Sequence, residues 1–176
     1  MSDEKASIYG NMSERHLLKW ALDYTMPWIV QTFESIPDDR LAVRPHANIN
    51  APGWIFGHIA VTERKHVGLA LEGIDDVPPE YRIFHTGARP TEQQIADAIE
   101  SKDALVKYWQ EVRAKTGRYL DTITDDDLAG VPETPWLARA WPNSENPRRE
   151  WFIMTIQHQN AHWGQLTVIE KLIATG

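Results

Sequence analysis

Hydrophobic residues recur at the three- and four-residue spacing of an α-helix in four segments of the chain. These segments span about residues 13–35, 51–71, 91–123 and 146–174. No stretch of convincing length alternates with the two-residue period of a β-strand. The pattern therefore predicts an all-α fold, a four-helix bundle with at least one crossover connection.

Proline, glycine and capping residues predict where these helices begin, end and bend. Pro27 lies inside the first segment and predicts a kink or a break there. Asn50 is the expected N-cap of the second helix, and Pro52 is favoured in its first turn. Gly73 is the expected C-terminal glycine of the same helix.

Two capping motifs and two long connections complete the predicted layout. Thr91 and Gln94 have the spacing of a capping box, which predicts the start of the third helix. Residues 124–128 predict a short capped turn. The connections 74–90 and 130–147 are rich in proline. The second carries Trp136 and Trp141, and its length makes it a candidate lid over a site.

Composition restricts the classes of function. The 176 residues fit one domain spanning residues 1–176. The absence of cysteine excludes disulfides, thiolate metal ligands and cysteine nucleophiles. A net charge of −7 without a basic cluster argues against nucleic acid, and no apolar run suits a membrane span. The start of the sequence lacks a secretory pattern, so we expect a cytoplasmic protein.

The most informative residues are His158 and His162, which lie four positions apart and share one face of the fourth helix. The residues within about 60° of His158 on a helix that turns ~100° per residue are mostly apolar, which predicts that this face is buried. They are Trp151, Met154, Thr155, Ala161, His162, Gln165, Ile169, Leu172 and Ile173. Two buried imidazoles are costly unless hydrogen-bonded or bound to a metal, and a shared divalent ion satisfies both.

A third ligand should come from another helix. His58, in the middle of the second helix, is the best candidate, and His66 is its rival about two turns further on. Three histidines leave a coordination position open, as in catalytic sites. Two other kinds of metal site do not match the sequence. The pair reads His-Gln-Asn-Ala-His, so it lacks the glutamate of the zinc-protease motif. A di-iron bundle needs further glutamate and histidine ligands, and that set is incomplete here.

Two segments carry a resemblance to a known family. Residues 50–59, NAPGWIFGHI, and residues 158–166, HQNAHWGQL, resemble the DinB-like superfamily, which includes YfiT-type bacillithiol transferases and the metal domain of mycothiol-dependent maleylpyruvate isomerase. The resemblance implies an up-down-down-up four-helix bundle with long crossover connections and the ligand set His58, His158 and His162. It further implies nickel or zinc, a homodimer, and a low-molecular-weight thiol as co-substrate.

These observations lead to a hypothesis and its alternatives. The hypothesis is a metal-dependent enzyme that transfers or isomerises with such a thiol. The alternatives are a metal-dependent hydrolase, a non-catalytic metal or small-ligand binding stress protein, and an interaction domain with vestigial histidines. Trp54, Gln165 and Trp151 are the candidate substrate-binding residues. No general base is evident, because Glu63 lies about 140° from His58 on an ideal helix.

Overall fold

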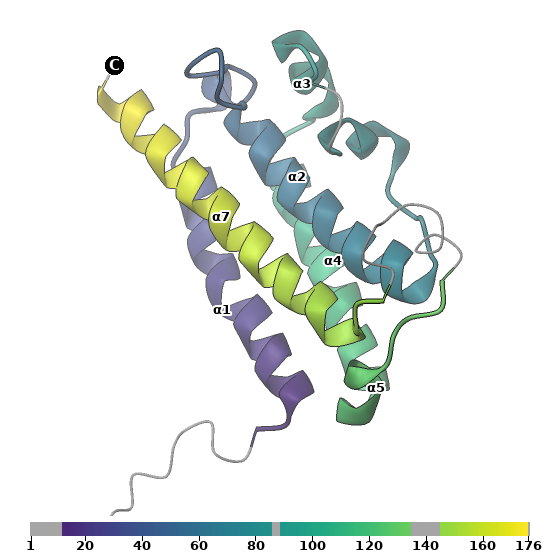
Figure 1. Ribbon diagram of the computed structural model, residues 1–176. Helices are drawn as coiled ribbons and strands as arrows, with labels where there is room; N and C mark the ends of the chain where they lie inside the picture. The colour runs from purple at the N-terminus through teal and green to yellow at the C-terminus, as the bar shows by residue number, and fades with distance from the viewer. Residues whose placement is uncertain (1–11, 86–88, 135–144, 176) are drawn as a thin grey trace, which may run out of the picture.

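The computed structural model describes residues 12–85, 89–134 and 145–175. Four long helical stretches lie side by side in it (Figure 1). They are α1 (Glu14–Glu34), α2 (Pro52–Arg64) with its π-helical continuation η2 (Lys65–Glu72), α4 (Lys102–Thr122) and α7 (Arg148–Thr175). In Figure 1 the chain ascends along α1, descends along α2 and α4, and ascends along α7. α7 contacts both α1 and α2, and α4 contacts the same two helices from the other side.

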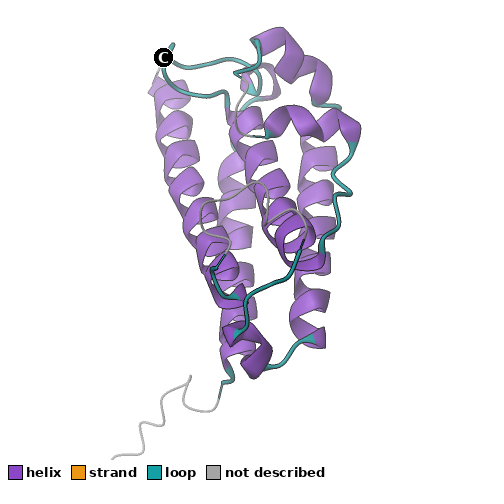
Figure 2. Ribbon diagram, turned by 45° about the vertical axis from the view of Figure 1, so that its right-hand side comes forward, coloured by secondary structure: helices purple, strands orange, loops and turns teal. Residues whose placement is uncertain are grey.

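Short helices occupy the connections and the ends of the bundle. They are η1 (Asp38–Arg40), η3 (Pro79–Phe84), α3 (Glu92–Ala98) and α5 (Asp125–Ala129). The residues that the structure describes contain no strand, as Figure 2 shows, and the all-α prediction is confirmed. None of the helices in this part of the chain has the length and hydrophobicity needed to cross a membrane.

Most predicted helix ends agree with the structure. Gly73 ends η2 in the left-handed conformation at φ 74°, which glycine adopts without steric cost. Both capping motifs form, with Thr91 Oγ1 accepting from the Gln94 backbone N–H and Thr124 Oγ1 accepting from that of Asp127. The local hydrogen-bonding chemistry of these residues was therefore sufficient to locate the helix starts.

Three details differ from the prediction. Of the kink or break predicted at Pro27, the break does not occur, because α1 continues through it. Pro27 is exposed, so water can satisfy the carbonyl that loses its partner there. Asn50 is not the N-cap of α2: Ala51 takes that position, and Asn50 Oδ1 instead accepts a hydrogen bond of 3.0 Å from Arg44.

The third correction concerns the single helix predicted over residues 91–123. The structure divides it into α3 and α4, with Ile99 in an extended conformation between them. Ser101 then caps α4, its hydroxyl accepting from the Ala104 backbone N–H at 3.0 Å. Ile99 packs against the apolar core in this arrangement, which favours the interruption over a continuous helix.

The interior contains two apolar clusters and several buried polar side chains. The larger cluster includes Phe33, Phe56 and Trp109, and the smaller includes Leu22 and Trp151. The buried polar and charged side chains are His58, Glu63, Arg64, Arg113, Thr116, Thr155 and Gln159. Because buried polar groups require partners, these side chains are where specific chemistry is expected.

Candidate metal site

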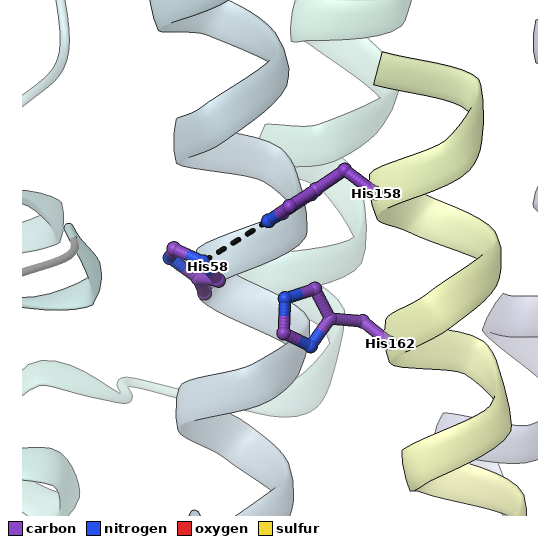
Figure 3. A group of neighbouring side chains, drawn as sticks. All are labelled: His58, His158 and His162. Atoms are coloured by element: carbon purple, nitrogen blue, oxygen red, sulfur yellow. Dashed lines mark hydrogen bonds between the residues drawn. The ribbon is translucent and has the colours of Figure 1, made fainter. Parts of the chain in front are cut away.

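Three imidazoles from two helices meet beside α2 and α7. His58 extends from α2 and His158 and His162 from α7, and their rings face one another (Figure 3). The Nε2 atoms of His58 and His158 are 3.1 Å apart, and the ring centroids of the three lie between 4.4 and 5.0 Å from one another. Each side chain offers one nitrogen within 4.8 Å of the other two.

This geometry fits one metal ion. Two nitrogens bound at about 2.0–2.1 Å to a tetrahedral ion lie about 3.4 Å apart. The 3.1 Å between His58 and His158 is near that spacing, and all three nitrogens lie within 4.8 Å. A set of neutral imidazoles suits zinc, nickel, copper and iron, whereas magnesium and calcium prefer oxygen ligands. Three ligands leave room for water or a substrate atom.

Hydrogen bonds orient two of the three rings. Nδ1 of His58 lies 2.6 Å from the carbonyl oxygen of Phe84, and since a carbonyl only accepts, this nitrogen carries the proton and Nε2 the lone pair. Nδ1 of His162 lies 2.9 Å from Oε1 of Gln165, while its other ring nitrogen faces His58 (Figure 3). Such partners behind the ligands commonly set ring orientation and tautomer in metal sites.

The surroundings keep these imidazoles neutral. Burial lowers the pKa of His58 to about 4 despite the hydrogen bond to Phe84, which acts in the opposite direction. Burial and the neighbouring imidazoles lower the pKa of His158 to about 2, and burial also lowers that of His162. All three lone pairs are therefore available to an ion at neutral pH.

His58, and not its rival His66, lies beside the two histidines of α7. His66 lies in η2, where its Nδ1 is 2.9 Å from Thr155 Oγ1 and its ring contacts Trp151. Its ring centroid is 6.3 Å from that of His158, and it is outside the three-histidine group. Burial lowers the pKa of His66 to about 4 as well. It is a neutral core histidine with its own partner.

The candidate substrate-binding residues separate into two groups. Trp54 stacks on His58 at a centroid distance of 4.6 Å, and its Nε1 donates to the carbonyl of Ile83. Gln165 is exposed and hydrogen-bonded to His162. Trp151 is fully buried and contacts His66, so it presents no surface to a ligand. Trp136, Trp141 and most of the candidate lid lie outside the described residues.

The expectation that the whole histidine face of α7 is buried is only partly correct. Trp151, Thr155 and Ile169 are buried, but Ala161, Gln165 and Leu172 are exposed. Neighbouring helices therefore cover one side of the imidazoles and leave the side toward Gln165 open to solvent. A helical-wheel projection of one helix does not show how much of its apolar face the other helices cover.

A network beside the imidazoles was not expected from the sequence. Arg113 on α4 donates from Nε and Nη2 to the buried Glu63 carboxylate, both at 2.8 Å, and from Nη2 to Oε1 of Gln159 at 2.7 Å. It also donates to the carbonyl of Leu22 on α1. Burial acts to raise the pKa of Glu63, but Arg113 and the hydrogen bonds hold it below its usual value. Glu63 contacts Trp109, Arg113 and Thr116 on α4, and its angle of about 140° from His58 predicted that it points away from the imidazoles.

Two further contributors, Phe84 and Gly57, had only a weak signal in the sequence. A side chain on Gly57 would place its Cβ 2.6 Å from ring carbons of Phe84, so the absence of one allows the end of η3 to approach α2. That approach brings the carbonyl of Phe84 to His58. A glycine directly before a candidate ligand was the available signal, but nothing in the sequence identified its partner.

Comparisons with known proteins bear on the fold described above. The model of the DinB superfamily matches residues 22–166 of the chain. Among solved structures, the chain is similar to the crystal structure of a conserved protein from Enterococcus faecalis, with 20% sequence identity and a TM-score of 0.69. The similarity covers 94% of this chain and 99% of that one, and it establishes a shared fold. The comparison with curated proteins gave no match.

Proposed function

The chain belongs to the DinB superfamily, and from this premise we propose that it binds one divalent ion, nickel or zinc, through His58, His158 and His162. The observation that carries the proposal is the convergence of three neutral imidazoles, one buried and two half-buried, whose nitrogens lie within 4.8 Å of one another. Imidazole ligands suit both metals, and the open side toward Gln165 gives a further ligand access.

The proposed activity is a transfer or isomerisation that uses a low-molecular-weight thiol. A bound ion would favour the thiolate, the reactive form of a thiol. The chain's residues would position that thiol: His58 is held by Phe84 and Trp54, and Gln165 lies at the open side. In a transfer, sulfur bonds to an electrophilic carbon, the leaving group departs with its electron pair, and the thiol proton passes to solvent. We expect this activity in the cytoplasm.

Metal binding is tested by metal analysis and chelator competition on the purified protein. We expect one ion per chain in the wild type. We expect metal affinity to fall at least about 100-fold in each of the variants His58→Ala, His158→Ala and His162→Ala. Loss of a group that only hydrogen-bonds to a metal ligand already lowers metal affinity about 10–100-fold. His16→Ala, at an exposed position on α1, is the matched control. A wild type without stoichiometric metal, together with unchanged nickel or zinc binding by His158→Ala, would overturn the proposal.

Thiol chemistry is tested by following conjugation of small thiols to 1-chloro-2,4-dinitrobenzene, from which sulfur displaces chloride. The metal-loaded wild type should exceed the uncatalysed rate, and His158→Ala should not. Lack of turnover by a protein that binds both metal and thiol favours the non-catalytic binding alternative. Metal-dependent ester cleavage without thiol favours the hydrolase, in which a bound water would be the nucleophile.

We also propose that the chain forms a homodimer through α1. Leu17, Trp20, Tyr24 and Trp28 repeat at three- and four-residue spacing along α1, with exposed fractions between 38% and 57%. Exposed aromatic stripes of this kind commonly mark interaction sites. In a two-fold symmetric dimer, the stripe of one chain packs against the same stripe of the second chain.

Light scattering coupled to gel filtration tests this assembly. The wild type should elute at twice the monomer mass, and Tyr24→Lys with Trp28→Lys should elute as a monomer. Gln110→Lys, at an exposed position of α4, is the control and should remain dimeric. A monomeric wild type would exclude the dimer.

A further inference from the structure

A cavity of about 390 Å³ lies between α7 and the segment that precedes α2. Its polar lining consists of Asn48, Asn50 and Gln165, and its apolar lining includes Ile49, Val168 and Ile169. Gln165 connects the cavity to the three-histidine group, because it lines the cavity and contacts His162 at 2.9 Å. The volume is within the range of small-molecule sites.

The fixed partners of two carboxamides determine what they offer a ligand. A guanidinium only donates, so the atom of Asn50 that faces Arg44 at 3.0 Å is its oxygen, and its NH₂ group is the donor that remains. His162, if it ligates through Nε2, carries its proton on Nδ1 and donates it to Gln165 Oε1. Gln165 then also has its NH₂ group available as a donor.

The lining has no charged residue, which restricts the ligand further. Phosphate groups are usually bound by arginine or lysine, and Arg44 already donates to Asn50 and to the carbonyl of Pro90. Two neutral donors beside apolar side chains complement a ligand that combines carbonyl oxygens with a short carbon skeleton.

We propose that this cavity holds the body of the thiol and selects thiols whose skeleton carries neutral carbonyl oxygens, such as amide groups. The inference rests on the proposed thiol function and adds the chemical class of the thiol. Asn50 and Gln165 are the specificity-determining residues, and Ile49, Val168 and Ile169 contact the skeleton.

Gly164 provides a test that preserves the fold. A Cβ at this position meets nothing within 4 Å, and the residue lies on an exposed turn of α7 that lines the cavity. The Cβ of Gly164→Leu therefore meets no neighbour beside the cavity, and the substitution replaces a poor helix former with a good one. Gly117→Leu is the matched control, since Gly117 lies on α4 and lines a different cleft.

The experiment measures thiol dissociation constants on cobalt-substituted protein from the sulfur-to-cobalt absorption band. The probes are N-acetylcysteinamide, which has two amide carbonyls, and 1-propanethiol, which has none. The wild type should prefer N-acetylcysteinamide at least about tenfold, and Asn50→Leu should reduce that preference about fivefold, the effect of one hydrogen bond. Gly164→Leu should abolish the preference while cobalt stoichiometry remains unchanged, and Gly117→Leu should retain the preference.

The outcomes separate the two proposals. If neither thiol binds the cobalt-loaded wild type, the thiol function is wrong and this inference falls with it. If both thiols bind with equal affinity, or if Gly164→Leu retains the full preference, only the role of the cavity is wrong.

Discussion

The orientation of His58 depends on one missing methyl group. The carbonyl of Phe84 reaches His58 Nδ1 at 2.6 Å because Gly57 lets the Phe84 ring lie against α2. Gly57→Ala would place its Cβ 2.6 Å from that ring, so Phe84 must move. We expect zinc affinity to fall about 10–100-fold, the usual effect of losing a partner behind a ligand. Overpacking should also cost about 1–3 kcal/mol of stability.

Chelator competition and urea unfolding measure these two effects. Gly164→Ala makes the same chemical change on a helix where the Cβ meets open space, so both quantities should remain near wild type. Zinc affinity of Gly57→Ala within twofold of the wild type would show that the Phe84 contact does not control His58.

At the residue scale, part of the candidate site could be predicted from the sequence. The spacing of His158 and His162 places both on one face regardless of tertiary structure. The choice of His58 over His66 depends on how α2 and α7 align: His58 lies opposite the pair, whereas His66 lies opposite Thr155. The orienting partners of the rings come from Phe84 on a distant connection and from Gln165, and only Gln165 shares a predictable helical face.

At the scale of elements, Arg113 joins four helices beside the imidazoles. It binds Glu63 on α2, Gln159 on α7 and the carbonyl of Leu22 on α1. Arg113→Met would leave the fully buried Glu63 carboxylate without its cation, a change that typically costs about 3–5 kcal/mol. We therefore expect urea unfolding to show a loss of this order.

A surface ion pair is the appropriate comparison for Arg113. Lys19 and Asp121 form one at 2.7 Å between half-exposed side chains, and Lys19→Met should cost less than about 1 kcal/mol. Replacing both partners, as in Glu63→Leu with Arg113→Met, should recover much of the loss because no unpaired charge is left. A single Arg113→Met variant as stable as Lys19→Met would contradict this account.

The sequence predicted where helices begin and end better than it predicted whether a helix continues without interruption. The capping residues Thr91 and Thr124 and the terminal Gly73 act within a few bonds of the backbone they stabilise, so the sequence suffices. The interruption at Ile99 depends on burying that side chain against the core. The π-helical form of η2 likewise lacks a local signal that we recognise.

At the scale of the whole molecule, burial of the histidines makes stability depend on pH. The pKa of His58 and of His66 is lowered from 6.5 to about 4, and that of His158 to about 2. Below pH 6.5 the unfolded chain therefore binds protons that the folded chain still excludes. Stability should be complete above about pH 6.5 and should fall as the pH decreases toward 4, by up to about 1.4 kcal/mol per pH unit for each such group.

His66→Gln removes one of these titrating groups, and His66 lies outside the three-histidine group. In chelator-treated protein, urea unfolding at intervals from pH 7.5 to 4.5 should give a smaller slope for His66→Gln than for the wild type. His16→Gln removes an exposed histidine and should leave the slope unchanged. Because the slope reports proton uptake, it distinguishes loss of a titrating group from loss of the contact with Thr155, which lowers stability equally at every pH. Equal slopes for His66→Gln and the wild type would mean that burial does not hold His66 neutral.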